Sequence, residues 1–67
     1  MLDGKVIGER LRKLRGDIPR QIICNDAGIS LSALSMYETG ERIPRDEIKV
    51  ALARIYNMTV DELFYAK

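Results

Sequence analysis

The chain of 67 residues contains no histidine and no tryptophan, and its only cysteine is Cys24. A lone cysteine cannot form a disulfide within the chain. Without histidine or a second cysteine, the usual protein ligands of zinc are missing. The same absences remove the Cys/His arrangements that activate a nucleophile. We therefore expect no bound metal, no cofactor and no enzymatic activity.

Long apolar runs are absent too. No apolar stretch approaches the roughly 18 residues of a membrane span, and the N-terminal sequence lacks the pattern of a signal peptide. These absences predict a soluble, cytoplasmic protein with no membrane partner. The composition, 46% hydrophobic and 31% charged, is that of a globule and not of a disordered tail. The length predicts a single domain over residues 1–67, close to the lower size at which one core suffices, so dimerisation could matter.

The net charge of +1 is small, but the charge is unevenly distributed along the sequence. Residues 1–20 hold six Lys/Arg and three Asp/Glu, while the remainder is slightly acidic. A basic segment of this kind could form an edge that faces phosphates. The alternative is a solvated helix face with i, i+4 pairs such as Glu9 with Lys13, and we favour it for Arg10, Arg12 and Lys13.

The sequence from about residue 19 to residue 40 has the pattern of two short helices. Pro19 suits a first helical position, since its missing N–H would have no intrahelical partner there. Gly28 can adopt the left-handed conformation that ends a helix, and the Ser30 hydroxyl can cap a following helix that starts at about Leu31. Two short helices joined by a glycine-containing turn form a helix-turn-helix, whose second helix enters the DNA major groove.

Three further helices are expected around this motif. Apolar periodicity predicts the first over residues 5–15. The motif's second helix stops at residues 39–40, and the next helix opens at Arg45 or Asp46 and ends at Asn57. Thr59 and Glu62 have the spacing of a capping box that opens a short last helix. The apolar stripes of the first and fourth helices are Ile7, Leu11 and Leu14, and Ile48, Leu52 and Ile55.

Several other apolar residues are assigned by their position in the sequence. Ile18 precedes a helix start and is expected to pack inward as a hydrophobic staple. Ile43 is expected to tuck under its loop. Ile23 and Cys24 are assigned to the core, while the helical period turns Ile22 partly outward. For Cys24 a small, buried role is favoured, because a reactive thiol would need a nearby cation to lower its pKa.

The order and spacing of seven segments resemble those of a known family. The segments are residues 7–15, 27–30, 34–35, 37–40, 42, 44 and 58–63. The chain resembles the phage repressor/Cro (XRE-type) helix-turn-helix family, with two departures. The loop before Pro19 is about two residues shorter than is usual, and the Thr/Ser-Gln pair that commonly opens the motif is here Pro19-Arg20. The resemblance implies an all-α, compact five-helix repressor-type domain, and a structural pair between Arg15 and Glu38.

The motif and the resemblance together predict the DNA-binding residues. On the second helix of the motif, Leu34 and Tyr37 face the core, and the residues expected to face outward are Ser30, Leu31, Ser32, Ala33, Ser35 and Met36. None of these outward residues is Arg, Lys, Asn or Gln, which make the bidentate contacts to guanine and adenine. The residues expected at base edges are Ser30, Leu31, Ser32, Ser35 and Met36. The residues expected at phosphates are Arg20, Gln21, Thr39 and Arg42. For Leu31 and Met36, simple exposure or packing against a neighbouring segment remains an equal alternative.

Two functions follow from these features. The first is a sequence-specific transcriptional regulator, a repressor that binds double-stranded DNA as a homodimer on a palindromic operator. Its dimer interface is expected at the C-terminal end, because a domain this small has little core left for Leu63, Phe64 and Tyr65. The alternative is a protein-interaction module that keeps this fold and uses its apolar outward face to bind another regulator.

Overall fold

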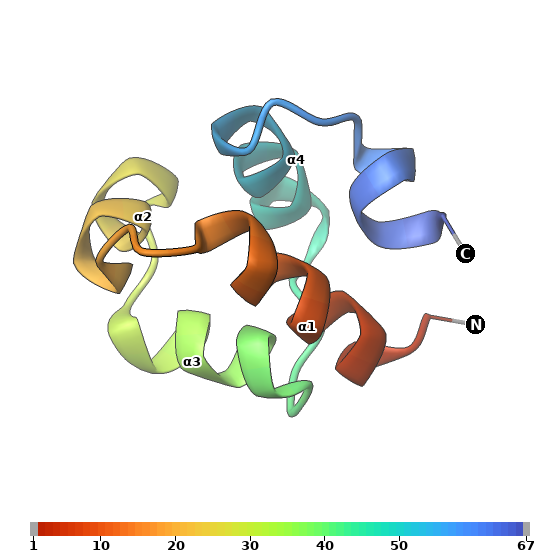
Figure 1. Ribbon diagram of the computed structural model, residues 1–67, viewed down its shortest axis with the longest axis horizontal. Helices are drawn as coiled ribbons and strands as arrows, with labels where there is room; N and C mark the ends of the chain where they lie inside the picture. The colour runs from red at the N-terminus through yellow and green to blue at the C-terminus, as the bar shows by residue number, and fades with distance from the viewer. Residues whose placement is uncertain (1, 67) are drawn as a thin grey trace.

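The computed structural model describes residues 2–66, which form four α-helices and one short π-helix and contain no strand. The all-α architecture with five helices is therefore confirmed. Figure 1 shows α1 crossing the middle of the molecule, with α2 and α3 toward one end and both chain ends at the other. The elements are α1 (Gly4–Arg15), α2 (Arg20–Ala27), α3 (Leu31–Thr39), α4 (Asp46–Ile55) and η1 (Asp61–Tyr65).

The first helix begins one residue earlier than predicted. The Asp3 carboxylate accepts hydrogen bonds from the backbone N–H of Lys5 at 3.0 Å and of Val6 at 3.4 Å. Such a cap satisfies N–H groups that have no partner within the helix. Gly4 can therefore form the first helical residue.

Helices α1 and α3 lie against each other with their backbones in close contact. Gly8 is buried in α1, and a Cβ atom there would collide with the Glu38 carbonyl and lie 2.8 Å from the Tyr37 carbonyl oxygen. At the end of α3, Gly40 has a φ of 84°, and a Cβ there would lie 2.9 Å from the backbone nitrogen of Lys5. Glycine at both places lets α3 sit directly on α1.

A single hydrophobic core joins the helices. It includes residues from both helices of the predicted motif, and Cys24 is buried in it as expected. Leu63 and Phe64 are also buried, so the expectation that the core has no room for them is wrong. Phe64 and Leu63 follow a tight turn that folds η1 back onto α1, which a local sequence pattern does not reveal. The core residues are Ile7, Leu11, Ile23, Cys24, Leu34, Tyr37, Leu52, Ala53, Leu63 and Phe64.

Two isoleucines predicted to be inside lie outside. Ile18 is 41% exposed, because its backbone N–H donates to the Arg15 carbonyl and its own carbonyl accepts from the Arg15 guanidinium. These bonds form a tight turn that directs the side chain outward. Ile43 is 37% exposed, and the neighbouring Pro44 is the residue of that loop that is buried.

The predicted apolar face of α4 packs against the core, and Lys49 is buried beside it. Leu52 is buried as expected, but Ile48 and Ile55 are only half-buried. Lys49 is 7% exposed, and its ammonium donates a 3.0 Å hydrogen bond to the Tyr65 hydroxyl. The same ammonium lies 5.2 Å from the centre of the Tyr65 ring, a cation–π distance. Burial of a lysine is thus compensated by a partner from the C-terminal turn.

The predicted capping box before η1 is confirmed. The Glu62 N–H donates to the Thr59 hydroxyl at 3.0 Å, and the Thr59 N–H donates to the Glu62 carboxylate at 2.9 Å. The other end of η1 is held by Arg10, whose guanidinium donates to the carbonyls of Leu63 at 2.6 Å and Ala66 at 3.0 Å. Arg10 therefore anchors the C-terminal turn to α1 and is not part of a solvated face. None of the helices formed by residues 2–66 has the length and apolar character needed to cross a membrane.

Candidate nucleic-acid interface

The turn between α2 and α3 has the geometry that its sequence predicts. Gly28 is left-handed, with φ 70° and ψ 37°, and it ends α2. The N–H of Ile29 then donates to the Cys24 carbonyl at 3.0 Å. The Ser30 hydroxyl accepts a 3.0 Å hydrogen bond from the Ala33 N–H and caps α3. Pro19 departs from the prediction, because its ψ of 139° places it before the helix as the N-cap.

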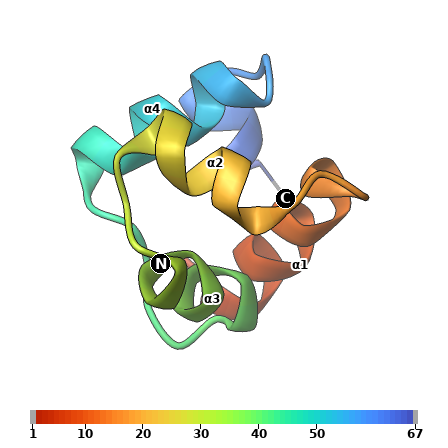
Figure 2. The ribbon, with the colours of Figure 1, turned by 90° about the vertical axis from the view of Figure 1, so that its left-hand side faces the viewer.

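One face of α3 is buried against the rest of the molecule, and the opposite face is exposed to solvent. Leu34, Tyr37 and Glu38 are buried, which fixes the helix. In Figure 2, α3 lies at the edge of the molecule beneath α2. Met36, one of the predicted base-contact residues, is only half-buried. The other four are exposed, and they are Ser30, Leu31, Ser32 and Ser35.

The residues predicted to contact phosphates lie at the ends of this motif, all exposed. Arg20 and Gln21 form the start of α2, and the Gln21 amide donates to Asn25 at 2.9 Å. The Arg42 N–H donates to the Met36 carbonyl at 3.2 Å, so the loop after α3 is held on that helix. The Thr39 hydroxyl lies 3.3 Å from the Glu41 carboxylate. That negative charge makes Thr39 the least favourable of the four for a phosphate.

A buried carboxylate ties the motif to α1. The Arg15 guanidinium donates from Nε to Glu38 Oε2 at 2.7 Å and from Nη2 to Glu38 Oε1 at 3.1 Å. This bidentate pair is the one that the resemblance implies. Glu38 also accepts a 3.2 Å hydrogen bond from Nε of Arg20, a contact that was not predicted from the sequence. The hydrogen bonds to Glu38 stabilise the charged form of the Arg15 guanidinium, which raises the pKa of Arg15.

Comparison with known families agrees with this geometry. The family model described as helix-turn-helix matches residues 23–63, more than half of the chain. The chain belongs to the phage repressor/Cro (XRE-type) helix-turn-helix family. No curated protein matches the chain. Members of this family are DNA-binding regulators of transcription and not typically enzymes, so the chain is assigned to that regulatory class.

The match begins within α2, so α1 and the first turn of α2 lie outside it. This N-terminal part contains the two departures from the family pattern, the short loop and the Pro19-Arg20 pair. In this helix-turn-helix protein the short loop is closed by Arg15, whose guanidinium donates to the Ile18 carbonyl at 3.0 Å. The residue that secures α3 therefore also shapes the entry to α2.

The single cysteine of this helix-turn-helix protein is structural. Cys24 is 2% exposed, and its thiol lies 3.5 Å from the Ser30 carbonyl. Burial raises the pKa of the Cys24 thiol, which keeps it protonated and unreactive. Among residues 2–66, no group of three or more Cys, Asp or Glu side chains is arranged to hold a metal ion.

The Tyr56 hydroxyl is buried and has no hydrogen-bond partner within residues 2–66. Burial raises the pKa of Tyr56 to about 12. Since the unfolded chain ionises first, stability from the neutral phenol is complete below pH 10 and is lost as the pH rises from 10 to 12. We expect Tyr56→Phe to leave the free energy of unfolding at pH 7 unchanged or raise it by up to about 1 kcal/mol, and to reduce its loss above pH 10.

Urea unfolding of this variant at neutral and alkaline pH measures both effects. Tyr65→Phe is the matched control, because it deletes a hydroxyl that accepts from Lys49. The control should therefore lose stability at neutral pH. An equal loss in Tyr56→Phe would contradict the account, since it would show that the Tyr56 hydroxyl makes a stabilising contact.

Proposed function

We propose that this protein is a repressor that binds a palindromic operator as a homodimer, with α3 in the major groove. The observation that carries the proposal is that α3 is buried on one face and exposed at its N-terminal part. Its inner face is fixed by the burial of Leu34, Tyr37 and Glu38, while its N-terminal part is exposed and capped by Ser30. A helix held rigidly with its N-terminal residues open is the arrangement that reads base edges.

The outward side chains of α3 define how such a complex would work. Ser32 and Ser35 can exchange hydrogen bonds with bases, and Leu31 and Met36 offer apolar contacts to thymine methyl groups. Each such contact adds little energy. Most of the affinity must then come from phosphates, each of which releases counterions when a cation neutralises it. The cations placed for this role are Arg20 and Arg42.

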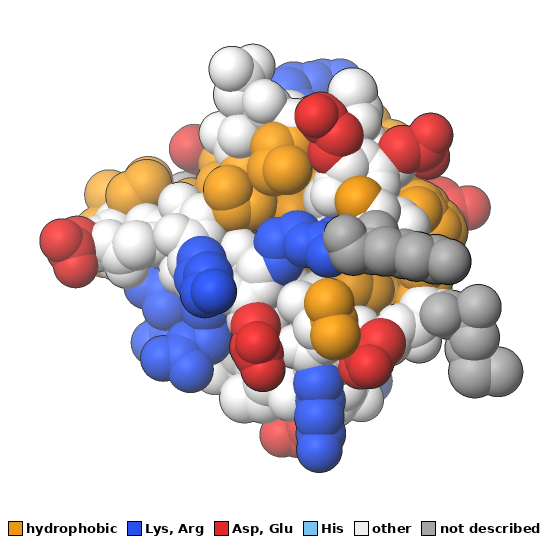
Figure 3. Space-filling view, turned by 45° about the vertical axis from the view of Figure 1, so that its right-hand side comes forward, with side chains coloured by type: hydrophobic (Ala, Val, Ile, Leu, Met, Phe, Trp, Pro, Cys, Tyr) orange, Lys and Arg blue, Asp and Glu red, His pale blue; other side chains and the backbone are white. Residues whose placement is uncertain are grey.

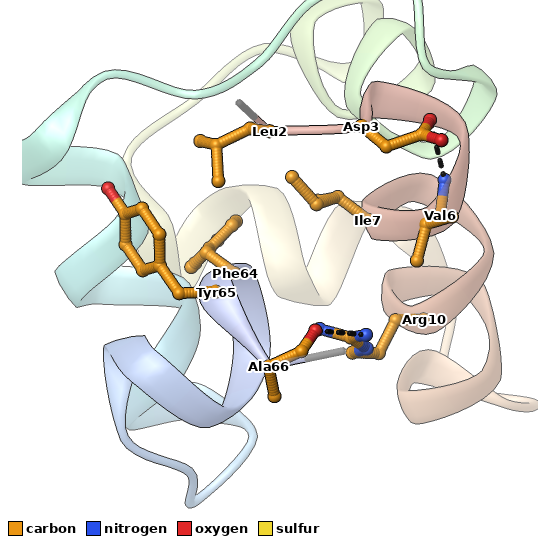
Figure 4. A pocket seen from close by; sticks show the side chains of 8 residues that line it. All are labelled: Leu2, Asp3, Val6, Ile7, Arg10, Phe64, Tyr65 and Ala66. Carbon is orange, nitrogen blue, oxygen red and sulfur yellow. Dashed lines mark hydrogen bonds between the residues drawn. The ribbon is translucent and has the colours of Figure 1, made fainter.

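We assign the dimer interface to a groove between α1 and η1. The groove has a volume of about 490 Å³. Val6 and Tyr65, two of its lining residues, are 47% and 51% exposed. Figure 4 shows the side chains that line it: Leu2, Asp3, Val6, Ile7, Arg10, Phe64, Tyr65 and Ala66. Of the three C-terminal residues, Phe64 and Tyr65 line this groove, so the proposed interface stays at the C-terminal end and extends onto α1.

The position and charge of this groove suit a second copy of the chain. It lies at the end of the molecule with both chain ends, away from the turn between α2 and α3 (Figure 1). A twofold axis there leaves both α3 helices free to face one DNA duplex. Acidic, basic and apolar side chains alternate over the middle of the face seen in Figure 3. Mixed charge of this kind favours a protein partner over a nucleic acid.

Val6→Glu is expected to break the dimer, because it places a carboxylate in the apolar groove. Val50→Glu is the matched control, since Val50 has the same 47% exposure but lies on α4. In sedimentation experiments at high micromolar concentration, the wild type and Val50→Glu should be dimers and Val6→Glu a monomer. A wild type that stays strictly monomeric, with and without DNA, would rule out the dimer.

DNA binding should depend steeply on salt. Arg42→Ala should weaken specific and non-specific binding alike and reduce the slope of log K against log salt concentration by about one. Arg20→Ala should do the same, whereas Ser32→Ala and Leu31→Ala should act mainly on sequence preference. Titrations of these four variants with duplex DNA at two salt concentrations measure both effects. Binding that is insensitive to salt, or absent at low salt, would contradict the proposal.

A second function, binding of another regulatory protein, is favoured by one observation. Leu31 is 49% exposed at the start of α3, on a face without Arg, Lys, Asn or Gln. If that face binds a protein, Leu31 and Met36 are its anchors, and truncation of either should cost about 1–3 kcal/mol of partner binding. Arg20→Ala should then have little effect. The same set of variants therefore separates the two functions.

A further inference from the structure

The Glu38 carboxylate is shared by two arginines from two different helices. Only 1% of its side chain is exposed. It accepts two hydrogen bonds from Arg15 of α1, at 2.7 and 3.1 Å, and one from Arg20 of α2, at 3.2 Å. One negative charge therefore faces two positive charges, which leaves a net positive charge at this cluster.

The two arginines use their nitrogens differently. Arg15 has a side chain only 13% exposed, and it donates from Nε, Nη1 and Nη2 to Glu38 and the Ile18 carbonyl. Arg20 has a side chain 44% exposed, and within residues 2–66 only its Nε makes a hydrogen bond. The excess positive charge is thus carried by a guanidinium whose two terminal nitrogens remain for a partner outside the chain. A planar fork of N–H donors matches the oxygens of a phosphate.

We infer that Glu38 is a positioning residue for DNA binding: it holds the Arg20 guanidinium by Nε and leaves its two terminal nitrogens to bind an operator phosphate. The inference rests on the proposed function. Arg20 is the first residue of α2, the helix of the motif that crosses the DNA backbone. A side chain fixed before binding loses less rotamer freedom on contact with its ligand. Since Glu38 belongs to α3, the same carboxylate sets the phosphate contact relative to the base-reading helix.

The inference separates Arg20 from an ordinary surface cation. Lysine carries the same charge on a single nitrogen, so it cannot hold Glu38 with one nitrogen while two others face a phosphate. Arg42 is the matched control, because it is exposed and its side chain makes no hydrogen bond or ion pair within residues 2–66. Exchange of arginine for lysine should therefore weaken binding more at position 20 than at position 42.

The test compares Arg20→Lys, Arg20→Ala, Arg42→Lys and Arg42→Ala. The probe is a duplex enriched by in vitro selection with the wild-type protein, titrated at two salt concentrations. We expect Arg20→Lys to bind about fivefold or more weakly than Arg42→Lys, with a salt slope unchanged in both. Arg20→Ala should bind more weakly still, and the slope of its log K against log salt concentration should fall by about one. Arg20→Lys binding as tightly as the wild type would overturn the inference.

Further results distinguish a failure of the inference from a folding defect and from a failure of the proposed function. In a Glu38→Gln background, Arg20→Lys should no longer weaken binding; an undiminished effect there would overturn the inference. If Glu38→Gln does not fold, the comparison of Arg20→Lys with Arg42→Lys decides alone. A lower thermal midpoint of Arg20→Lys with unchanged affinity would show a purely structural role and also overturn it. Wild-type protein that shows no salt-dependent DNA binding would instead contradict the proposed function.

Discussion

Arg15→Ala is expected to lower the free energy of unfolding by about 3 kcal/mol, because it removes the bidentate partner of a buried carboxylate. The side chain of Glu38 is 1% exposed, and the remaining partner Arg20 makes only a single 3.2 Å bond to it. A domain of this size has about 3–10 kcal/mol of stability in all, so the variant should lose about a third of it or more. Thermal unfolding should show a midpoint lower by more than about 10 °C.

The matched control for this variant is Arg12→Ala. Arg12 is an exposed arginine on the same helix, and its removal should change stability by no more than about 0.5 kcal/mol. At temperatures where Arg15→Ala is folded, its affinity for DNA should be close to that of the wild type. An unchanged thermal midpoint combined with a collapse of DNA affinity would mean that Arg15 contacts DNA directly.

Gly8→Ala should be the most damaging substitution of a single methyl group. Alanine normally stabilises a helix relative to glycine by about 1 kcal/mol. Here the added Cβ would collide with the Glu38 carbonyl and approach the Tyr37 carbonyl at 2.8 Å. Backbone atoms cannot rotate away as a side chain can, so α1 and α3 must move apart. We expect a net loss of about 2–3 kcal/mol in the free energy of unfolding, measured by urea titration.

Lys13→Ala is the control for Gly8→Ala, because Lys13 lies on the exposed face of α1. It should be nearly neutral. If Gly8→Ala were instead as stable as the wild type, the close contact between α1 and α3 would be wrong. The folded fraction of Gly8→Ala should also bind DNA more weakly, since the displaced α3 is the proposed base-reading helix.

Local signals in the sequence predicted the motif well. Gly28 ends α2 in the left-handed conformation, Ser30 caps α3, and Thr59 forms the predicted capping box. Each of these features involves residues no more than four positions apart, where backbone geometry and side-chain chemistry decide the outcome together. The Arg15–Glu38 pair was predicted too, but through the resemblance to a family and not through spacing.

Contacts between residues distant in the sequence were missed. Arg10 was assigned to a solvated face, yet it donates to carbonyls more than 50 positions away in the C-terminal turn. Lys49 was not expected inside, because its partner Tyr65 lies 16 positions away. Long, flexible side chains reach such partners only after the helices have packed, so no local period reveals them. The bond from Arg20 to Glu38, which carries our further inference, belongs to this group.

The predicted DNA contacts also depend partly on local sequence and partly on distant partners. The exposure of Leu31, Ser32 and Ser35 follows from the helical period once Leu34 and Tyr37 face the core. Which of these exposed residues touches a base depends on how α3 enters the groove, and that depends on the DNA and on the second copy of the chain. Their contacts with bases therefore remain predictions, which the sequence preferences of Ser32→Ala and Leu31→Ala test.

The most direct measurement is in vitro selection of wild-type protein against a library of random duplex DNA. The account predicts enrichment of inverted half-sites whose centres lie roughly one helical turn, or about 34 Å, apart. It also predicts that Ser32→Ala shifts the selected bases, whereas Val50→Glu, on the exposed part of α4, selects the same sites as the wild type. Enrichment of no sequence over the starting library, at a salt concentration where the protein is folded, would contradict the assignment of α3 as a base-reading helix.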